Sequence, residues 1–515
     1  PVNFEYFNEN KEYSLCQEVD MSMCGGWSRA NSPHSFKLKA SKTYNGLNSM
    51  DYQFFESKPF LKHKVLQIRN GGSGSRIKDS SLQEIMRRSG LYIDTQAWKP
   101  VRVYINGEFY ADLNMREPNN KHFAYANYGI DTDYMDQFEM SPDSGYVQMA
   151  GTKDSFNNLL NLSRNAADPI TYQKIGELLD LDEYINYMAV ELYLGNWDWP
   201  QNNVKGFRDQ NDGKFHFVVY DLDGAFSADI NTFFGKQWYT FDNLRGEDAL
   251  GNSLWGTRRY REIEFVTLFN NMLENEDFRK RFVDAMSIIG GSVFDYDYAY
   301  GVTAEMQEAM GTGNIWEVVG NLSGRQWSKA YELRQNDRFG VTDIEPQGTS
   351  LSSNVDGAQI LVNDMVVPMG KFNGYLFSPV TVKASAPAGY KFKGWRSNAS
   401  AGDTSSPVQT LFTRSSMWSY DDSNSPLDGT GWQTSTLSGS GLSPIGYDTT
   451  GSKSFNPYMG ERYQTYYFTK TFNIDSHVNP EDVFTLDYTV DDGMVVYVNG
   501  EEAGRYNMPD GEISF

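Results

Sequence analysis

Acidic and amide residues in the middle of the chain have the types and spacing that phosphoryl transfer requires. Asp198 and Asn203 stand in the pattern D-x-x-x-x-N, and an apolar run further along leads to Asp221 and Asp223. Phosphoryl transfer needs a carboxylate that orients the attacking hydroxyl, and hard oxygen ligands that hold Mg²⁺ against the β- and γ-phosphates. The order predicts Asp198 as the catalytic base and Asn203 and Asp221 as metal ligands. Asp223 is a secondary metal ligand or a structural residue.

A helix, a loop and a hairpin are the elements predicted to position these residues. The helix begins near Asp180, where Glu183 three residues later indicates a capping box, and Gly195 ends it. Two strand-like runs, 204–208 and 214–220, surround a turn and form the hairpin. The helix therefore delivers the first pair of residues, and the hairpin delivers the second.

The N-terminal part of the chain is predicted to be mainly strands. Residues 35–39 and 64–69 alternate between apolar and polar, as strands do. Residues 101–105 and 108–114 are joined by Asn106-Gly107, which is a strong signal for a hairpin. A short helical stripe lies between these regions, at Leu82, Ile85, Met86 and Leu91.

With these motifs the chain resembles the CotH family over roughly residues 15–340. The members of this family are spore-coat-protein-H-like atypical kinases. Family members show N-x-D-x-x-x-x-N, a hairpin and then D-x-D, a Gly-rich turn with Ser-Arg before a basic strand, and a strand-NG-strand hairpin that ends in Arg-Glu. The matching residues are Asn196, Asp198, Asn203, Asp221 and Asp223 for the first motif, Gly25, Gly26, Ser28 and Arg29 for the second, and Arg116 and Glu117 for the third.

The resemblance implies an α+β, bilobal kinase-like domain over residues 1–342, with ATP and Mg²⁺ between a sheet-rich and a helix-rich lobe. It also implies a Ser or Thr acceptor on a secreted or surface protein. The nucleotide-binding candidates are Gly25, Gly26, Ser28, Arg29, Lys37, Lys39, Arg69 and Glu117. Glu117 falls where kinases meet adenine, a task that backbone groups normally perform. Asp79 is either the helix-borne acid that orients a phosphate-binding cation or, as we slightly favour, an N-cap.

The chain departs from the family in one place. Family members usually have lysines just before the serine of the basic strand, whereas this chain has Pro33 and His34. Either Lys37, Lys39 or Arg69 substitutes in phosphate binding, or nucleotide affinity is weak. Lys37 and Lys39 are equally well explained as solvated charges on a strand. This departure leaves open the interpretation that the chain is a pseudokinase.

Beyond residue 343 the chain is rich in Ser, Gly and Thr, with short β-type runs. Residues 343–413 form a predicted small β domain, in which 380–395 reads as strand, turn, strand and resembles a divergent B-repeat. Residues 414–515 resemble a galactose-binding-like β-sandwich, and the chain is expected to end inside this domain. Such modules bind glycans or surface proteins through exposed aromatic residues, and Trp418 and Trp432 are the candidates.

Three other interpretations compete with the active kinase. Asp198 and Asn203 can simply form turns after a helix. Residues 218–224 also fit the D-x-D-G of HAD-type phosphatases, although no parallel β/α alternation surrounds them. The third is a catalytically dead kinase-like scaffold in a glycan- or protein-binding surface protein.

The bulk composition excludes several classes of partner. The formal net charge of the 515 residues is −22, which repels nucleic acid phosphates and anionic lipids. No apolar run is long enough to span a membrane. Cys16 and Cys24 can pair or be free, and the five histidines are scattered without metal-motif spacing. The chain begins at Pro1 without a visible signal segment, so an extracytoplasmic location is expected from the module resemblance alone.

Overall fold

The structure, a computed structural model, consists of two compact units, residues 1–391 and residues 392–515. It describes residues 1–72, 76–141, 144–211, 213–230, 233, 237–239, 257–259, 263–396, 411–412, 416–421, 425–427, 430–435, 437, 441–443, 465–472, 486 and 493–509, with only the backbone given for 27–28, 237–239, 257–259 and 441–443. The predicted domain boundaries at residues 342 and 413 stay predictions.

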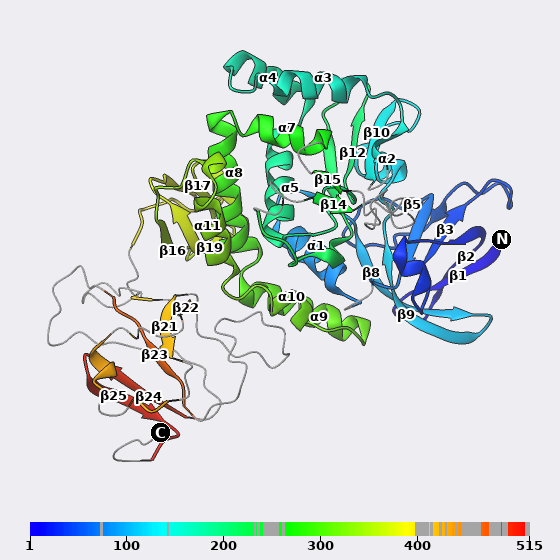
Figure 1. Cartoon of the computed structure of the whole chain (residues 1–515). Coiled ribbons are helices and arrows are strands. Elements are labelled where there is room, and N and C mark those ends of the chain that lie inside the picture. Colours follow the sequence, from blue (N-terminus) through cyan, green and yellow to red (C-terminus); the bar gives the residue numbers. More distant parts are fainter. Residues whose placement is uncertain are drawn as a thin grey trace, which may run out of the picture. The chain divides into compact units, whose positions relative to one another are not determined.

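A six-stranded antiparallel sheet begins the first unit, in the order β1-β2-β3-β6-β9-β8 (Figure 1). Its alternating side chains bury Phe36, Leu38 and Ile68 in one apolar core, so Lys37 and Arg69 lie on the opposite face. The predicted strands and the Asn106-Gly107 hairpin are confirmed. The strands are β1 (Val2–Phe7), β2 (Tyr13–Met23), β3 (Phe36–Ala40), β6 (Val65–Arg69), β8 (Trp98–Ile105) and β9 (Glu108–Arg116).

Helix α1 (Lys78–Ser89) connects this sheet to the rest of the unit. The predicted stripe is confirmed at Leu82, Ile85 and Met86, which are fully buried, whereas Leu91 lies beyond the end of the helix. Gly90 ends the helix in the left-handed conformation. Ile77, and not Asp79, occupies the N-cap position. The preference for Asp79 as a cap is therefore wrong, because the helix begins at Lys78, two residues earlier than a cap at Asp79 would place it, and the Asp79 carboxylate binds Arg116 and the backbone N–H of Leu222.

A second sheet, ordered β11-β10-β12-β13-β7, carries the hairpin that delivers the acidic residues. Only the pair β13–β7 is parallel, whereas the neighbouring pairs are antiparallel. A HAD-type arrangement needs parallel β/α alternation, so the described strands do not favour it. The strands are β7 (Asp94–Thr95), β10 (Met135–Ser141), β11 (Gly145–Ala150), β12 (Lys205–Asp209) and β13 (His216–Val219).

Helix α5 (Leu181–Leu194) runs through the main core and has the predicted ends. The Asp180 side chain accepts a hydrogen bond from the backbone N–H of Glu183 at 3.2 Å, and Gly195 closes the helix with φ +63°. A Cβ on Gly195 would lie 2.0 Å from the carbonyl oxygen of Ala228, so only glycine fits there. The capping box is only half formed, because the backbone N–H of Asp180 donates to Phe215 and the Glu183 carboxylate binds β13.

Further helices surround α5 and give the second half of this unit its helical character (Figure 1). The α+β class predicted from the sequence is confirmed. The helices are α2 (Lys121–Tyr128), α3 (Asp154–Ser163), α4 (Pro169–Leu178), α7 (Glu264–Met272), α8 (Glu276–Ile288), α9 (Tyr296–Met310), α10 (Trp316–Val319) and α11 (Arg325–Arg334). Among the described helices, none has the length and apolarity that a membrane span needs.

Two small sheets follow and pack against α8. Phe372 and Leu376 share a buried cluster with Ile288, and a Cβ on Gly291 would lie 2.3 Å from the Phe372 ring. The predicted strand after residue 380 is present, but its partner is absent from the described residues 386–396, so the strand-turn-strand prediction is half right. The strands are β16 (Pro346–Ser352), β17 (Gln359–Val362), β18 (Met365–Val367), β19 (Lys371–Phe377) and β20 (Val382–Ser385).

The second unit contains short strands in its described parts. They are β21 (Trp418–Asp421), β22 (Gly441–Ser443), β23 (Tyr467–Thr469), β24 (Met494–Val498) and β25 (Glu501–Tyr506). Trp432 packs its ring against Tyr467 and Tyr497, with centroids 5.0 and 5.7 Å apart. The apolar and aromatic residues of 484–488 also predict a strand, and all of this range except residue 486 lies outside the described residues.

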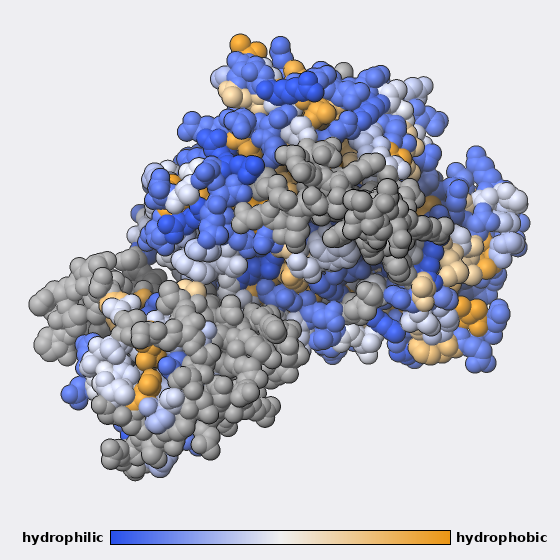
Figure 2. Space-filling model, in the orientation of Figure 1, coloured by the Kyte–Doolittle hydropathy of each residue, from blue (hydrophilic) through white to orange (hydrophobic). Residues whose placement is uncertain are grey.

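The surface on the side seen in Figure 2 is mainly hydrophilic, with small apolar patches. Both cysteines are free thiols, Cys16 being exposed and Cys24 half-buried. The open question about their pairing is therefore settled in favour of free thiols.

Candidate functional site

The loop after α5 brings Asp198 and Asn203 into contact. The side-chain amide of Asn203 donates to Oδ2 of Asp198 at 3.2 Å, and Asn202 donates to the same oxygen at 3.1 Å. Asn203 has φ +55°, a conformation that asparagine tolerates better than most residues. Its amide oxygen is the atom that it can offer to a metal, because the nitrogen is bound to the carboxylate.

Asp221 lies in a left-handed turn directly after β13, with φ +59°. Nη2 of Arg69 lies 3.6 Å from its Oδ1. The next backbone N–H, that of Leu222, donates to Asp79 at 2.9 Å. The turn is thus tied to the first sheet and to α1, which place Asp221 opposite a cation.

Asn196 joins the two acidic segments. Its Oδ1 accepts the backbone N–H of Asp198 at 3.3 Å, and its Nδ2 lies 3.5 Å from the carbonyl of Asp221. Its Nδ2 also donates to buried Glu191 at 3.3 Å. A Cβ on Gly224 would lie 2.6 Å from the Asn196 oxygen, so glycine is required for this approach. Asn196 and Gly224 thereby hold the catalytic candidate and the metal-ligand candidates in one place.

The carboxylates of this site raise one another's pKa values. Burial is the largest cause for Asp198, whose pKa is raised to about 6 with the negative charge of Asp221 contributing. Burial and the charges of Asp221 and Asp79 raise the pKa of Asp223 to about 7. Burial also raises the pKa of Asp221, although Arg69 opposes the rise. Such a group of oxygen donors with excess negative charge fits a hard divalent cation such as Mg²⁺.

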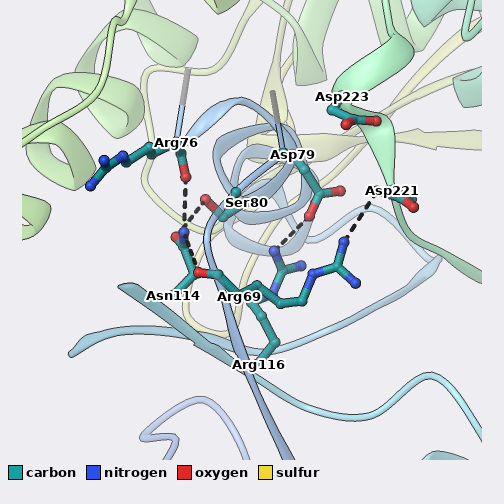
Figure 3. A pocket seen from close by; sticks show the side chains of 10 residues that line it. Arg69, Arg76, Asp79, Ser80, Asn114, Arg116, Asp221 and Asp223 are labelled. Atoms are coloured by element: carbon teal, nitrogen blue, oxygen red, sulfur yellow. Dashed lines mark hydrogen bonds and ion pairs between the residues drawn. The ribbon is translucent and has the colours of Figure 1, made fainter. Parts of the chain in front are cut away.

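A pocket of about 270 Å³ lies beside these carboxylates (Figure 3). The guanidinium groups of Arg69 and Arg116 lie side by side in it, Arg69 directed at Asp221 and Arg116 bound to Asp79 at 2.7 Å. A Cβ on Gly72 would lie 2.7 Å from the carboxylate of Asp223, so this glycine packs directly on the acidic pair. The residues that line the pocket are Arg69, Gly71, Gly72, Arg76, Asp79, Ser80, Asn114, Arg116, Asp221 and Asp223.

The other predicted nucleotide-binding residues are more scattered. Burial raises the pKa of Cys24, and the positive charges of Arg69, Lys37 and Arg29, which all lie near this thiol, oppose the rise. Lys39 is exposed, and its charge contributes, after burial, to lowering the pKa of His122 at the start of α2. Gly25 is half-buried with φ +100°, and Gly26 is exposed. The Ser28 side chain lies outside the described part of the chain.

Glu117 is placed in a structural network. Its carboxylate accepts the backbone N–H of Ala97 at 2.7 Å and the amide of Asn127 at 3.1 Å, and Lys58 lies 3.2 Å away. Its backbone carbonyl accepts from Gln96 at 2.6 Å. The residue is fully buried, and these contacts connect α2 to the first sheet. A role of its side chain in binding adenine remains a prediction that these contacts do not favour.

No sequence pattern assigned a role to the side chain of Arg116, and Asp79 was expected to be an N-cap. Asp79 lies inside the site, bound to Arg116 and to the backbone of Leu222. The signal that could have found the pair is the strand register. Arg116 is opposite Gln67, and Gln67 is opposite Lys37, so the three side chains share one face of the sheet.

Asp180, Glu183 and His216 form a second cluster whose ligand atoms lie within 4.8 Å of one another. Glu183 accepts from the ring of His216 and from the backbone N–H of Phe217 at 2.8 Å, and Asp180 accepts from Tyr92 at 2.9 Å. The carboxylates are thus engaged in joining α5 to β13. Asp94, on the neighbouring strand β7, accepts from Tyr128 at 2.8 Å.

The pH dependence of stability is expected to change in Asp94→Asn. Burial and the nearby Glu183 raise the pKa of Asp94 to about 7, against opposing effects of Tyr128, His216 and Lys58. A raised folded-state pKa means that the native protein binds more protons between about pH 4 and 7, so the ionised carboxylate lowers the unfolding free energy as pH rises through that window. We expect the variant to melt roughly 3 °C or more above the parent at pH 8, with the difference vanishing near pH 4.

Differential scanning calorimetry from pH 4 to pH 8 measures this. Asp343→Asn, on an exposed carboxylate, is the matched control and should follow the parent. An Asp94→Asn curve parallel to the parent curve at every pH would contradict the assignment.

The chain matches a protein-family model and has similarity to a solved structure. The family model described as CotH kinase protein matches residues 21–331. Among solved structures, the chain is similar to the crystal structure of a Helicobacter pylori proinflammatory kinase, CtkA, at 12% identity and a TM-score of 0.26, covering 56% of this chain and 99% of that one. No curated protein matches the chain.

Proposed function

Since the chain belongs to the CotH kinase protein family, we propose that it transfers the γ-phosphoryl group of ATP, with Mg²⁺, to a Ser or Thr hydroxyl. The observation that carries this proposal is the contact of Asp198 with Asn203 beside the turn that holds Asp221. Two chain segments, the loop after α5 and the turn after β13, supply one base and a set of oxygen ligands at a single place. Phosphoryl transfer needs little more than this positioning and charge stabilisation.

Asp198 is proposed to accept the proton of the acceptor hydroxyl. A pKa near 6 leaves the carboxylate ionised at neutral pH and still basic enough to take a proton in the transition state. The hydrogen bonds from Asn202 and Asn203 fix the carboxylate, so its lone pairs are oriented before the substrate arrives.

Asn203, Asp221 and Asp223 would hold Mg²⁺. The metal, when bound, supplies charge neutralisation to the phosphates. Arg69 is the proposed substitute for the missing lysines, because it ends β6 within 3.6 Å of Asp221. Lys37 lies on the same sheet face, and Lys205 lies 5.2 Å from the ring of Tyr220, the residue before Asp221. These cations give a locally basic wall in a protein of net charge −22.

The acceptor is proposed to belong to a secreted or surface protein, and the β-rich C-terminal part to attach the enzyme to a glycan or a protein. The support is the family membership and the module resemblance. The dead-scaffold alternative is supported by Pro33 and His34, which replace the expected lysines.

A melting-temperature titration with ATP separates these two proposals. A ligand that binds only the folded state stabilises it by RT ln(1 + [L]/Kd), about 2.7 kcal/mol at a hundredfold excess over Kd. We expect a rise with ATP and Mg²⁺ and a much smaller one with ATP in EDTA. Mass spectrometry of the chain and of an added acceptor such as casein then reports phosphate transfer. The absence of any rise at millimolar ATP would favour the dead scaffold.

A further inference from the structure

Arg116 presents an unused edge to the pocket beside the acidic turn. The residue is 3% exposed, and one of its terminal nitrogens, Nη1, is bound to Asp79 at 2.7 Å. Its Nε and Nη2 have no hydrogen-bond partner among the described residues. Buried donors are nearly always satisfied, so a ligand is expected at this edge.

The edge formed by Nε and Nη2 is suited to an oxyanion. These two N–H groups lie side by side on the planar guanidinium and can bind two oxygens of one phosphate at once. Arg69 lines the same pocket, and its 3.6 Å separation from Asp221 is too long for a hydrogen bond. Two guanidinium groups therefore converge on one space, and neither is saturated by carboxylates.

The size of the space limits what can enter it. The space holds about 270 Å³ and is open to solvent on one side, so it admits one end of an anion from that side and does not enclose a whole nucleotide. Ser80, which is 2% exposed, lines this space at the start of α1, and its hydroxyl donates to the carbonyl of Ile77 at 3.1 Å. Gly71 and Gly72 bring the backbone close on the remaining side.

We propose that Arg116 and Arg69 together bind one phosphoryl group of the nucleotide, Arg116 through its Nε–Nη2 edge. This inference rests on the proposed function, because it names residues that hold the phosphates of the same donor. It makes Arg116 a binding residue, and the contact with Asp79 fixes the guanidinium in place for it.

The test uses the full chain with Arg116→Lys, which keeps a positive charge toward Asp79 but has no Nε–Nη2 edge. Isothermal titration with Mg²⁺ measures Kd for ATP, for inorganic pyrophosphate and for adenosine. We expect Kd for ATP and for pyrophosphate to rise about tenfold or more, in line with the loss of a charge-assisted bidentate contact. Adenosine, which has no phosphate, should bind as it does to the parent.

Arg102→Lys is the matched control, since Arg102 belongs to the same sheet and pairs with Asp112 on an exposed face. Ser80→Thr is a second variant that alters no charge and adds one methyl group at the pocket. It should weaken phosphate binding even if Arg116→Lys fails to fold.

The outcomes separate this inference from the proposed function. Unchanged Kd values for both variants mean that only water occupies the edge, and the inference fails while ATP binding stands. Pyrophosphate binding that depends on Arg116, without ATP binding by the parent, supports the anion pocket and overturns the kinase proposal. If the parent binds neither, both proposals fail.

Discussion

Asp221→Ala is expected to abolish the Mg²⁺-dependent stabilisation by ATP and to lower phosphate transfer by about a thousandfold or more. Asp221 is the proposed metal ligand nearest to Arg69, at 3.6 Å. Without its carboxylate, Asn203 and Asp223 offer too little charge to hold Mg²⁺ against the phosphates. The gain of about 2.7 kcal/mol expected at a hundredfold excess of ligand over Kd should therefore disappear.

The backbone conformation of the turn makes a matched control necessary in this experiment. Asp221 has φ +59°, and alanine is strained there whatever the function of the side chain. Asp364 has φ +67° in the turn between β17 and β18 and lies on the surface, paired with Lys383. Asp364→Ala therefore measures mainly the backbone cost, since an exposed ion pair contributes only about 1 kcal/mol or less. Asp221→Asn keeps the conformation and removes the charge.

The comparison of these variants decides the role of Asp221. A lower melting temperature without ligand in both alanine variants, with ATP binding lost only at Asp221, supports the metal site. If ATP with Mg²⁺ stabilises Asp221→Asn as much as the parent, Asp221 binds no metal. The assignment of the site would then have to be abandoned.

The local signals in the sequence were sufficient for the elements that carry the site. Asp180 and Gly195 specify the ends of α5 by capping and by backbone conformation, which are properties of the nearest residues. The alternation in residues 35–39 and 64–69 likewise fixed which side chains face the core. The positions of Asp198, Asn203 and Asp221 then followed from the lengths of the loop and the hairpin.

The remaining contacts depend on pairings across the chain that no local pattern contains. Asp79 and Arg116 meet because α1 packs near β9, 37 residues further along. Glu183 fits a capping box by spacing, but β13 offers it a backbone N–H and His216 from more than thirty residues away. Glu117 lies in a position that family resemblance linked to adenine, and its contacts with Lys58 and Asn127 arise from the folded neighbourhood.

Asp198 has two opposite effects: its carboxylate is proposed to serve catalysis, and its buried negative charge lowers the stability of the folded protein. Burial raises its pKa to about 6, which means that the ionised form is disfavoured in the folded protein. Asp198→Asn removes that charge, so the variant should be at least as stable as the parent at pH 8.

Asp198→Asn is expected to reduce the rate of transfer by about 10²–10⁴-fold, the usual contribution of general base catalysis. Kd for ATP with Mg²⁺ should change less than threefold, because the proposed base contacts the acceptor and not the nucleotide. In the parent, the rate should fall as pH drops below about 6, where Asp198 takes up a proton and can no longer accept one. Steady-state rates and calorimetric Kd values, each measured from pH 5 to pH 8, check the three expectations.

Asp343→Asn, on an exposed carboxylate, serves as the control and should leave rate, affinity and pH profile unchanged. A variant that loses ATP affinity along with activity would place Asp198 among the metal ligands, since Asn203 at 3.2 Å connects the two roles geometrically. Full activity in Asp198→Asn would remove the base from the mechanism. The turn interpretation of the D-x-x-x-x-N segment would then account for the contacts, and any transfer would have to proceed by metal and phosphate positioning alone.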